Sequence, residues 1–361
     1  MHPKFDDAFY MNKKHILISG LLLFAFSFLA VQNTFAQTEI QVRTTDTMMK
    51  FSARPEAGFN FEYLIFLPKG TPLNTTTYLM VETNNSGLND TMKHHLKGAL
   101  HAAANGVASY VARRLHLPLL VPVFPRSATH WTYYTHALDR DVLLTKEFGI
   151  ERLDLQLLAM IEDARVQLVR QKYLLQQPFF MTGFSASGTF ANRFALLHPQ
   201  KLKAVAAGGI NAIAILPVEH IGGDTLHYPL GIADVPRITG QPVDVAAFRK
   251  LPQLLYMGAL DDNDAAAFDD AYSAKERAQV YNLMGKKLVP QRWSFMQKIY
   301  EQNGVKAEFR TYDHMGHGTD EKINNDLVAF FRKHLLPGFE NRGKKKTNFL
   351  YAIYPQTLAT L

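Results

Sequence analysis

Residues 178–188 read PFFMTGFSASG, and this stretch decides the fold that the sequence predicts. Residues 179–181 form a short apolar run, which is typical of a strand buried on both faces. Small residues follow, and apolar residues then recur at helical spacing over 190–197. A strand that turns sharply into a helix, with small residues around a serine, has the geometry of a nucleophile elbow. Ser185 is therefore expected to present its hydroxyl at the start of the helix, where free N–H groups favour negative charge.

The motif differs from G-x-S-x-G at one position. Ser187 stands where the second glycine belongs, and Gly188 follows it. Serine is small enough for such a turn, so we expect Ser185 to be the nucleophile, with Ser187 as the rival. The alternative is a glycine-rich turn between a strand and a helix that carries no chemistry.

Composition indicates a soluble globular protein without a cofactor. The hydrophobic content of 47% and the charged content of 20% are ordinary for such a protein, and 361 residues suffice for one large α/β domain or two smaller ones. The net charge of +7 includes the lysines at 344–346, and no basic stripe is interleaved with aromatic residues, so no nucleic-acid partner is expected. The absence of cysteine excludes disulfides, a thiol nucleophile and thiolate metal ligands. No spacing indicates a metal site or a nucleotide-binding loop.

The N-terminus has the pattern of a targeting segment. Residues 13–15 are basic, residues 16–31 are mostly apolar, and small residues end at Ala36. This pattern predicts a cleavable signal peptide over 1–36 and export to the periplasm or beyond. The apolar run is short for a membrane span, so no membrane insertion is expected after cleavage. Met11 is an alternative start.

Strands and helices alternate along the rest of the chain. This alternation predicts a mostly parallel central sheet covered by helices on both faces, within a single domain over 37–337. Residues 210–250 break the rhythm and are interpreted as an insertion over the site, and 338–361 as a C-terminal tail. The predicted strands are 59–67, 78–81, 117–124, 179–181, 202–207, 254–257 and 307–312, and the predicted helices are 96–115, 153–173, 274–284, 292–302 and 323–335.

Three loops at predicted strand ends carry Ser185, Asp261 and His317, in that order. Ligands bind at the carboxyl ends of the strands in open α/β sheets. A serine hydroxyl is a poor nucleophile unless a histidine accepts its proton, and an acid holds that histidine in the correct tautomer. The order serine, acid, histidine thus predicts a catalytic triad.

Neighbouring residues offer alternatives for two members of this triad. Asp262 and Asp264 are close enough to replace Asp261, although carboxylates at a strand end are often helix caps. His314 is the rival of His317, but it lacks the following glycine that lets the loop fold back.

On these motifs the sequence resembles the α/β-hydrolase superfamily, especially exported bacterial serine esterases of the polyester-depolymerase and feruloyl-esterase kind. In that superfamily the acid commonly lies three residues after a strand-end glycine, which selects Asp261, and the histidine commonly precedes a glycine, which selects His317. The long separation of these two residues implies a helical insertion around 265–290. The resemblance covers about 59–335 and rests on GFSASG (183–188), GALD (258–261) and GHG (316–318).

The resemblance implies the α/β-hydrolase fold and hydrolysis of carboxylic esters through an acyl-enzyme intermediate. The substrate is expected to be a small-molecule or polymer-linked ester. A serine peptidase on the same fold and a catalytically idle binding protein are the alternatives.

Two further sets of residues are expected at the site. For the oxyanion hole, Ala186 supplies one N–H and Asn85 the second, with Asn84 and Ser86 as alternatives and an ordinary Asn-rich turn as the bland interpretation. Asn84 and Phe184 are also expected to contact the substrate. The ring-rich loop at 130–140 follows the strand before the elbow, and Trp131, Tyr133 and Tyr134 either line the substrate pocket or pack under the loop.

Overall fold

The computed structural model describes residues 40–336, so the predicted signal peptide and C-terminal tail lie outside the described residues. Its main sheet is built from β1 (Thr47–Phe51), β2 (Tyr63–Leu67), β4 (Met80–Val81), β5 (Leu119–Pro122), β7 (Phe179–Phe184), β8 (Leu202–Gly208), β11 (Gln253–Gly258) and β12 (Ala307–Tyr312). Two short pairs are β3 (Thr76–Thr77) with β6 (Leu174–Leu175) and β9 (His220–Ile221) with β10 (Asp224–Thr225).

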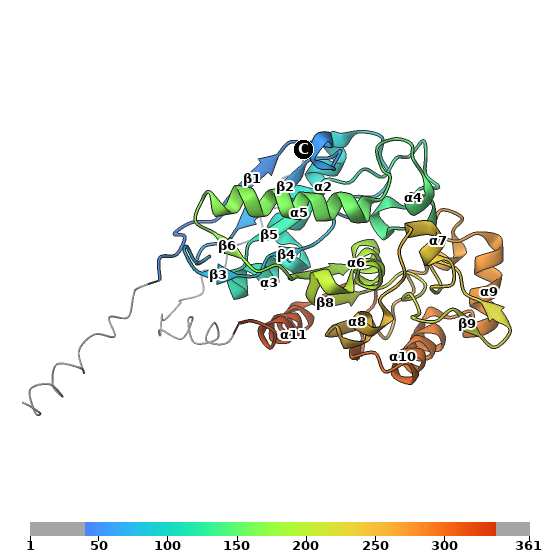
Figure 1. Ribbon diagram of the computed structural model, residues 1–361. Helices are drawn as coiled ribbons and strands as arrows, with labels where there is room; N and C mark the ends of the chain where they lie inside the picture. Colours follow the sequence, from blue (N-terminus) through green and yellow to red (C-terminus); the bar gives the residue numbers. More distant parts are fainter. Residues whose placement is uncertain (1–39, 337–361) are drawn as a thin grey trace, which may run out of the picture. The chain divides into compact units, whose positions relative to one another are not determined.

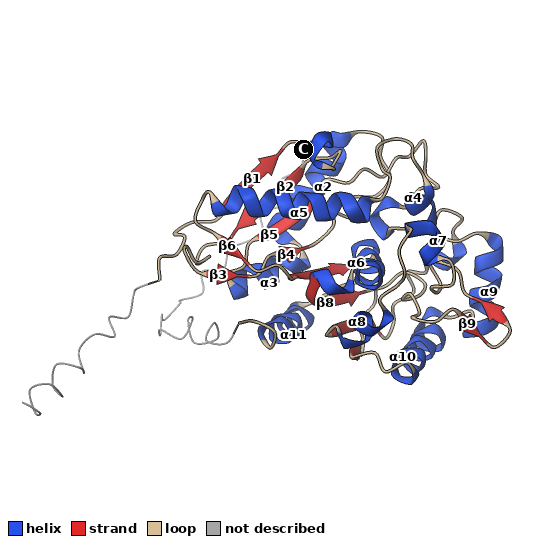
Figure 2. Ribbon diagram, viewed as in Figure 1, coloured by secondary structure: helices blue, strands red, loops and turns tan. Residues whose placement is uncertain are grey.

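The main sheet has eight strands in the order β1-β2-β5-β4-β7-β8-β11-β12. The strands from β5 to β12 in this order are parallel to one another, whereas β2 runs antiparallel to both β1 and β5. The strands that carry the candidate residues therefore all end at the same edge of the sheet. Figures 1 and 2 show this sheet with helices around it.

The helices are α2 (Met92–Asn105), α3 (Val107–Leu115), α4 (Arg140–Leu144), α5 (Leu153–Val169), α6 (Ala186–Leu197), α7 (Val235–Thr239), α8 (Val245–Lys250), α9 (Ala274–Met284), α10 (Trp293–Gln302) and α11 (Glu321–Arg332). Short helical turns are η1 (Pro55–Ala57), η2 (Thr135–Ala137), η3 (Pro199–Lys201), η4 (Ala265–Ala267) and η5 (Leu288–Arg292).

Two separate hydrophobic cores cover the two faces of the sheet. Alternate side chains of a strand point to opposite faces, and accordingly Ile65 belongs to one core while Leu64 belongs to the other. Helices α5, α6, α8 and α10 contribute to the first core, and α2, α3 and α11 to the second. The predicted layering is thus confirmed. Within residues 40–336, no helix is both long and apolar enough to cross a membrane.

One predicted helix is wrong. The stretch 96–115 forms two helices, because Gly106 is extended (φ −69°, ψ 173°) and interrupts the helical path. A Cβ at Gly106 would lie 2.5 Å from the Ala102 carbonyl oxygen and 2.8 Å from Oε2 of Glu82. Glu82 instead accepts a hydrogen bond from the Ala108 N–H (3.1 Å), so the side chain at the end of β4 binds the start of α3.

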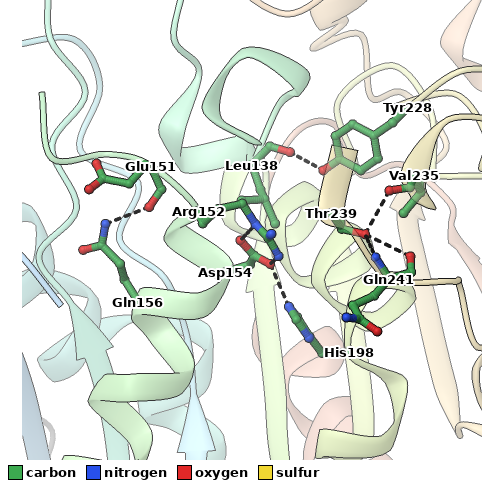
Figure 3. A network of polar contacts seen from close by, with 10 residues as sticks. All are labelled: Leu138, Glu151, Arg152, Asp154, Gln156, His198, Tyr228, Val235, Thr239 and Gln241. Carbon is green, nitrogen blue, oxygen red and sulfur yellow. Dashed lines mark hydrogen bonds and ion pairs between the residues drawn. The ribbon is translucent and has the colours of Figure 1, made fainter. Parts of the chain in front are cut away.

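A buried ion-pair network fixes the far end of the helix that follows Ser185 (Figure 3). Asp154, at the start of α5, is fully buried and accepts hydrogen bonds from Arg152 Nε (2.9 Å) and Nη2 (2.7 Å). It also lies 2.8 Å from Nε2 of His198, the C-cap residue of α6. Burial raises the pKa of Asp154, but the hydrogen bonds from His198 and Arg152 outweigh it and hold the pKa below its ordinary value. Charged hydrogen bonds thus tie α6 to α5.

Residues 210–250 form the β9–β10 hairpin and the short helices α7 and α8. Tyr228 donates a hydrogen bond from its hydroxyl to the Leu138 carbonyl, a contact that Figure 3 also shows. Arg140 pairs with Asp234 (2.5 Å) and donates to the Tyr228 carbonyl (2.9 Å). These contacts join residues 210–250 to the loop that contains the predicted aromatic residues.

Candidate active site

Ser185 occupies a strained backbone position between β7 and α6. Its dihedrals are φ 63° and ψ −129°, a combination that costs a non-glycine residue about 1–3 kcal/mol. Two backbone hydrogen bonds hold it there: its N–H donates to the Gly208 carbonyl, and its carbonyl accepts from the Thr189 N–H, both at 2.9 Å. The residue is partly exposed. Strain of this kind at a strand-to-helix turn is the expected geometry of a nucleophile elbow.

The neighbouring small residues are required by close backbone contacts. A Cβ at Gly183 would lie 2.4 Å from the Ser187 carbonyl, and one at Gly188 would lie 2.3 Å from the Gly208 carbonyl oxygen. Ser187 is only 2% exposed, and its hydroxyl donates to the Phe184 carbonyl (2.9 Å) and accepts from the Phe184 N–H (3.0 Å). Ser187 therefore closes the turn, which favours the other serine as the reactive one.

Asp261 and His317 are in direct contact. Nδ1 of His317 lies 3.0 Å from Oδ1 and 2.9 Å from Oδ2 of Asp261, which is 4% exposed. A carboxylate only accepts hydrogen bonds, so in the neutral imidazole Nδ1 carries the proton and Nε2 has the free lone pair. The His317 ring lies 4.8 Å from the ring of Phe184, the residue before Ser185. The structure thus brings the predicted acid and histidine together beside the elbow.

Asn263 contacts both Asp261 and His317, although no sequence motif singles it out. Its side-chain Nδ2 lies 2.9 Å from His317 Nε2, and its backbone N–H donates to Asp261 Oδ1 at 3.1 Å. With the proton on Nδ1, the amide must be the donor and Nε2 the acceptor. The exposed Asn263 side chain therefore occupies the lone pair that a serine hydroxyl would need.

The rival acids and histidine lie elsewhere. Asp262 and His314 are exposed. Asp264 caps η4 by accepting from the Ala266 N–H (3.0 Å), and it forms an ion pair with the fully buried Arg292. Asp264 therefore has the capping role that carboxylates at strand ends often have. The catalytic roles of Asp261 and His317 stay predictions.

The register of β4 and β7 places the predicted oxyanion loop next to the elbow. Val81 pairs with Met181 in these parallel strands. Asn85 and Ser185 each follow this pair by four residues, so both lie at the same edge of the sheet. Asn85 is an exposed residue, and its role in the oxyanion hole stays a prediction.

Asn84 holds this loop to the neighbouring strand. It is fully buried, its Nδ2 donates to the Phe124 carbonyl (2.9 Å), and its Oδ1 accepts from the Phe124 N–H (3.0 Å). Nδ2 also lies 3.3 Å from Nε2 of His136, which is buried; burial lowers the pKa of His136 to about 3 and keeps it neutral. These contacts give Asn84 a structural role, and its contact with substrate stays a prediction.

The three rings of the aromatic loop differ in burial and in what they pack against, and the expected contact of Trp131 and Tyr133 with substrate stays a prediction. Trp131 is 45% exposed, and Tyr133 packs against Phe148 with ring centroids 5.9 Å apart. Tyr134 is 7% exposed and belongs to a small buried cluster with Ala186, the residue after Ser185. Among the three rings, Tyr134 is thus the one that the structure ties to the elbow.

The chain is similar to many solved structures, among them two hydrolytic enzymes. One is poly(aspartic acid) hydrolase-1 from Sphingomonas sp. KT-1, with 15% identity and a TM-score of 0.50 over 80% of this chain and 98% of that chain. The other is LpqC, a poly(3-hydroxybutyrate) depolymerase from Bordetella parapertussis, with 12% identity and a TM-score of 0.51 over 84% of this chain and 94% of that chain. No protein-family model and no curated protein matches the chain. With its mostly parallel eight-stranded sheet and its likeness to these structures, the chain has the α/β-hydrolase fold.

Proposed function

We propose that the protein is an exported serine hydrolase that cleaves carboxylic esters. Ser185 is the nucleophile, His317 the general base and Asp261 the residue that orients the imidazole. The observation that carries this proposal is the combination of a strained, partly exposed serine with a histidine–carboxylate pair beside it. The strained backbone of Ser185 lowers the stability of the fold, and strain of this kind is typical of functional sites rather than of purely structural turns.

In the first half-reaction, Ser185 Oγ attacks the ester carbonyl carbon while its proton passes to His317 Nε2. The Asn263 amide must leave Nε2 before this transfer. Asp261 stabilises the imidazolium that forms, and the N–H groups of Ala186 and Asn85 bind the oxyanion. The imidazolium then protonates the departing alcohol, which leaves an acyl-enzyme.

In the second half-reaction, His317 takes a proton from water, and the resulting hydroxide equivalent attacks the acyl carbon. Collapse of the tetrahedral intermediate returns the proton to Ser185 and releases the carboxylic acid. The names of the two similar structures, a hydrolase and a depolymerase, add support for hydrolysis, while the choice of an ester bond rests on the site.

The proposal is tested by hydrolysis of 4-nitrophenyl butyrate by the wild type, Ser185→Ala and Ser187→Ala. Ser185→Ala should lower turnover by at least about 10⁴-fold, because triad members act as a unit. Ser187→Ala should keep turnover within about tenfold and lose stability by about 1 kcal/mol, since it loses only hydrogen bonds within the turn.

The reverse result, an active Ser185→Ala and an inactive Ser187→Ala, would contradict the assignment of the nucleophile. A wild type that cleaves butyryl 4-nitroanilide but not the ester would indicate a peptidase. A wild type that cleaves neither would indicate a binding protein.

A further inference from the structure

A buried polar cluster that the proposed mechanism does not use lies at the ends of β5 and β8. Arg126, Tyr134 and Asn211 are 9%, 7% and 5% exposed. The Arg126 guanidinium carbon lies 3.6 Å from the centroid of the Tyr134 ring, and Nη2 pairs with Asp270 Oδ2 at 2.5 Å. Asn211 Nδ2 donates to the Tyr134 hydroxyl at 3.3 Å.

This cluster is adjacent to the elbow. Tyr134 shares a buried cluster with Ala186, whose N–H is proposed for the oxyanion hole, and Ala271 packs against that cluster. The Asn211 N–H donates to Thr189 Oγ1 (3.0 Å), and the Thr189 N–H donates to the Ser185 carbonyl (2.9 Å). The Tyr134 ring therefore contacts the Arg126 guanidinium and shares a buried cluster with Ala186, the residue after Ser185.

Two buried polar atoms of this cluster lack a hydrogen-bond partner among the residues that the structure describes. Within residues 40–336, Arg126 Nε and Asn211 Oδ1 are buried and have no hydrogen-bond partner. Burial raises the pKa of Tyr134, so its hydroxyl keeps its proton, and that hydroxyl already accepts from Asn211. Asp270 compensates the charge of the guanidinium, but a buried Nε–H without an acceptor remains costly unless a ligand binds it.

Asp270 shows that a carboxylate fits on this guanidinium. Asp270 lies in the segment between η4 and α9, which follows the loop that carries Asp261. Phe268 in the same segment is 61% exposed, so this part of the chain lies at the surface. The Asp270 side chain is 15% exposed, so the paired carboxylate lies next to solvent. A carboxylate from outside that replaced it would make the same charged hydrogen bonds.

We propose that Arg126, stacked on Tyr134, recognises a carboxylate carried by the substrate close to its scissile ester, and that Asp270 occupies this position in the free protein. The inference rests on the proposed function and adds the substrate class: esters with an anionic acyl or alcohol part. If the Arg126–Asp270 ion pair only held residues 268–272 in place, substitutions of either residue would leave the selectivity between anionic and neutral esters unchanged.

The test is the ratio of kcat/KM for an anionic ester to that for its neutral counterpart. The acyl-side pair is mono-4-nitrophenyl adipate and 4-nitrophenyl hexanoate. The alcohol-side pair is 4-butyryloxybenzoate and its methyl ester. Arg126→Gln should lower the ratio about tenfold or more in one of the two pairs, as expected for a lost hydrogen bond to a charged group.

Three further variants separate recognition from long-range charge and from folding. Arg126→Lys keeps the charge but loses the planar stacked group, and it should lower the same ratio about threefold or more. Asp270→Asn removes the competing carboxylate and should raise the ratio about threefold or more. Asp269→Asn removes the same charge from the adjacent, 71% exposed side chain and should leave the ratio unchanged.

The opposite signs for Arg126→Lys and Asp270→Asn keep the inference testable if Arg126→Gln does not fold. An active wild type with equal ratios in all variants would overturn the inference and leave the proposed function intact. A wild type that hydrolyses none of the four esters would contradict the proposed function, and the inference with it.

Discussion

The three aspartates at the end of β11 differ in what their side chains contact. Asp261 binds the imidazole of His317, Asp262 is exposed, and Asp264 caps η4 and pairs with Arg292. These contacts predict different consequences for the same chemical change. We expect the first aspartate to matter for turnover and the third for stability.

Asp261→Asn should keep the fold and lower ester turnover by about three to four orders of magnitude, because the amide no longer fixes the required tautomer. Asp264→Asn should lower the free energy of unfolding by about 3 kcal/mol, since it leaves the fully buried Arg292 without its partner charge. Measurements of ester turnover and of urea unfolding for both variants test these two roles. Asp262→Asn is the control, and it should change neither quantity because Asp262 is exposed. Loss of activity in Asp264→Asn alone would mean that the acid is assigned to the wrong residue.

Asn263 Nδ2 lies 2.9 Å from His317 Nε2, the nitrogen that the proposed mechanism assigns as proton acceptor for Ser185. Asn263→Ala should therefore raise kcat/KM for 4-nitrophenyl butyrate about 2- to 10-fold, the equivalent of one hydrogen bond between exposed groups. Asp262→Ala, at the exposed neighbouring position, should leave it unchanged. A decrease of tenfold or more in Asn263→Ala would show instead that the amide orients the imidazole.

Local motifs account for the residues that the sequence analysis placed at the site. Ser185 lies in a recognisable turn, and Asp261 and His317 each follow a strand-end pattern with glycine. Asn263 and Arg126 have no such pattern, because their significance comes from side-chain contacts with segments far away in the chain. Contacts of that kind follow only from the folded structure.

At the scale of elements, β4 and α3 are joined by a buried carboxyl group. Glu82 is 5% exposed, and burial raises its pKa from 4.5 to about 8. The unfolded chain releases this proton near pH 4.5 and the folded chain near pH 8, so the folded state binds more protons in between. The contribution of Glu82 to stability should therefore fall as the pH rises through this range.

Glu82→Gln should abolish this contribution while keeping the shape of the side chain. The melting temperature of the wild type, minus that of the variant, should decrease from pH 5 toward about pH 8. Taking the difference removes the opposite effect of groups such as His136. A difference that stays constant over this range would show that Glu82 is ionised in the folded protein at every pH tested.

The periodicity of the sequence predicted most elements, with β12 matching the predicted 307–312 residue for residue. The break between α2 and α3 was missed, because a glycine within an apolar helical pattern is often tolerated. A Cβ at Gly106 would meet both the Ala102 carbonyl oxygen and Glu82, and the contact with Glu82 from a distant segment is not contained in helix periodicity.

At the scale of the whole molecule, the central sheet lies between two hydrophobic cores, one on each face. The candidate residues follow the carboxyl ends of its parallel strands. Structures with only 12–15% sequence identity share this fold. Because one fold can host many reactions, the proposed reaction rests on the residues of the site and not on the fold. The parallel strands bring Ser185, Asp261 and His317 to one edge although they are far apart in the chain. The sheet thereby determines where these three residues lie, and the loops at its edge carry their side chains.

Export is also a prediction about the whole molecule. Residues 1–36 have the pattern of a signal peptide, so the mature protein should begin near Gln37. N-terminal sequencing of protein recovered from outside the cytoplasm tests this prediction. Retention of the basic residues at 13–15 in that material would indicate an uncleaved membrane anchor.

The most direct test of the central claim is the site of covalent labelling by a fluorophosphonate probe. After proteolysis, mass spectrometry of the labelled wild type should find one adduct, on Ser185. The label should be absent from Ser185→Ala, present in Ser187→Ala, and much slower to form in His317→Gln, because the serine needs a base. An adduct on Ser187, or no adduct on a folded wild-type protein, would contradict the proposed mechanism.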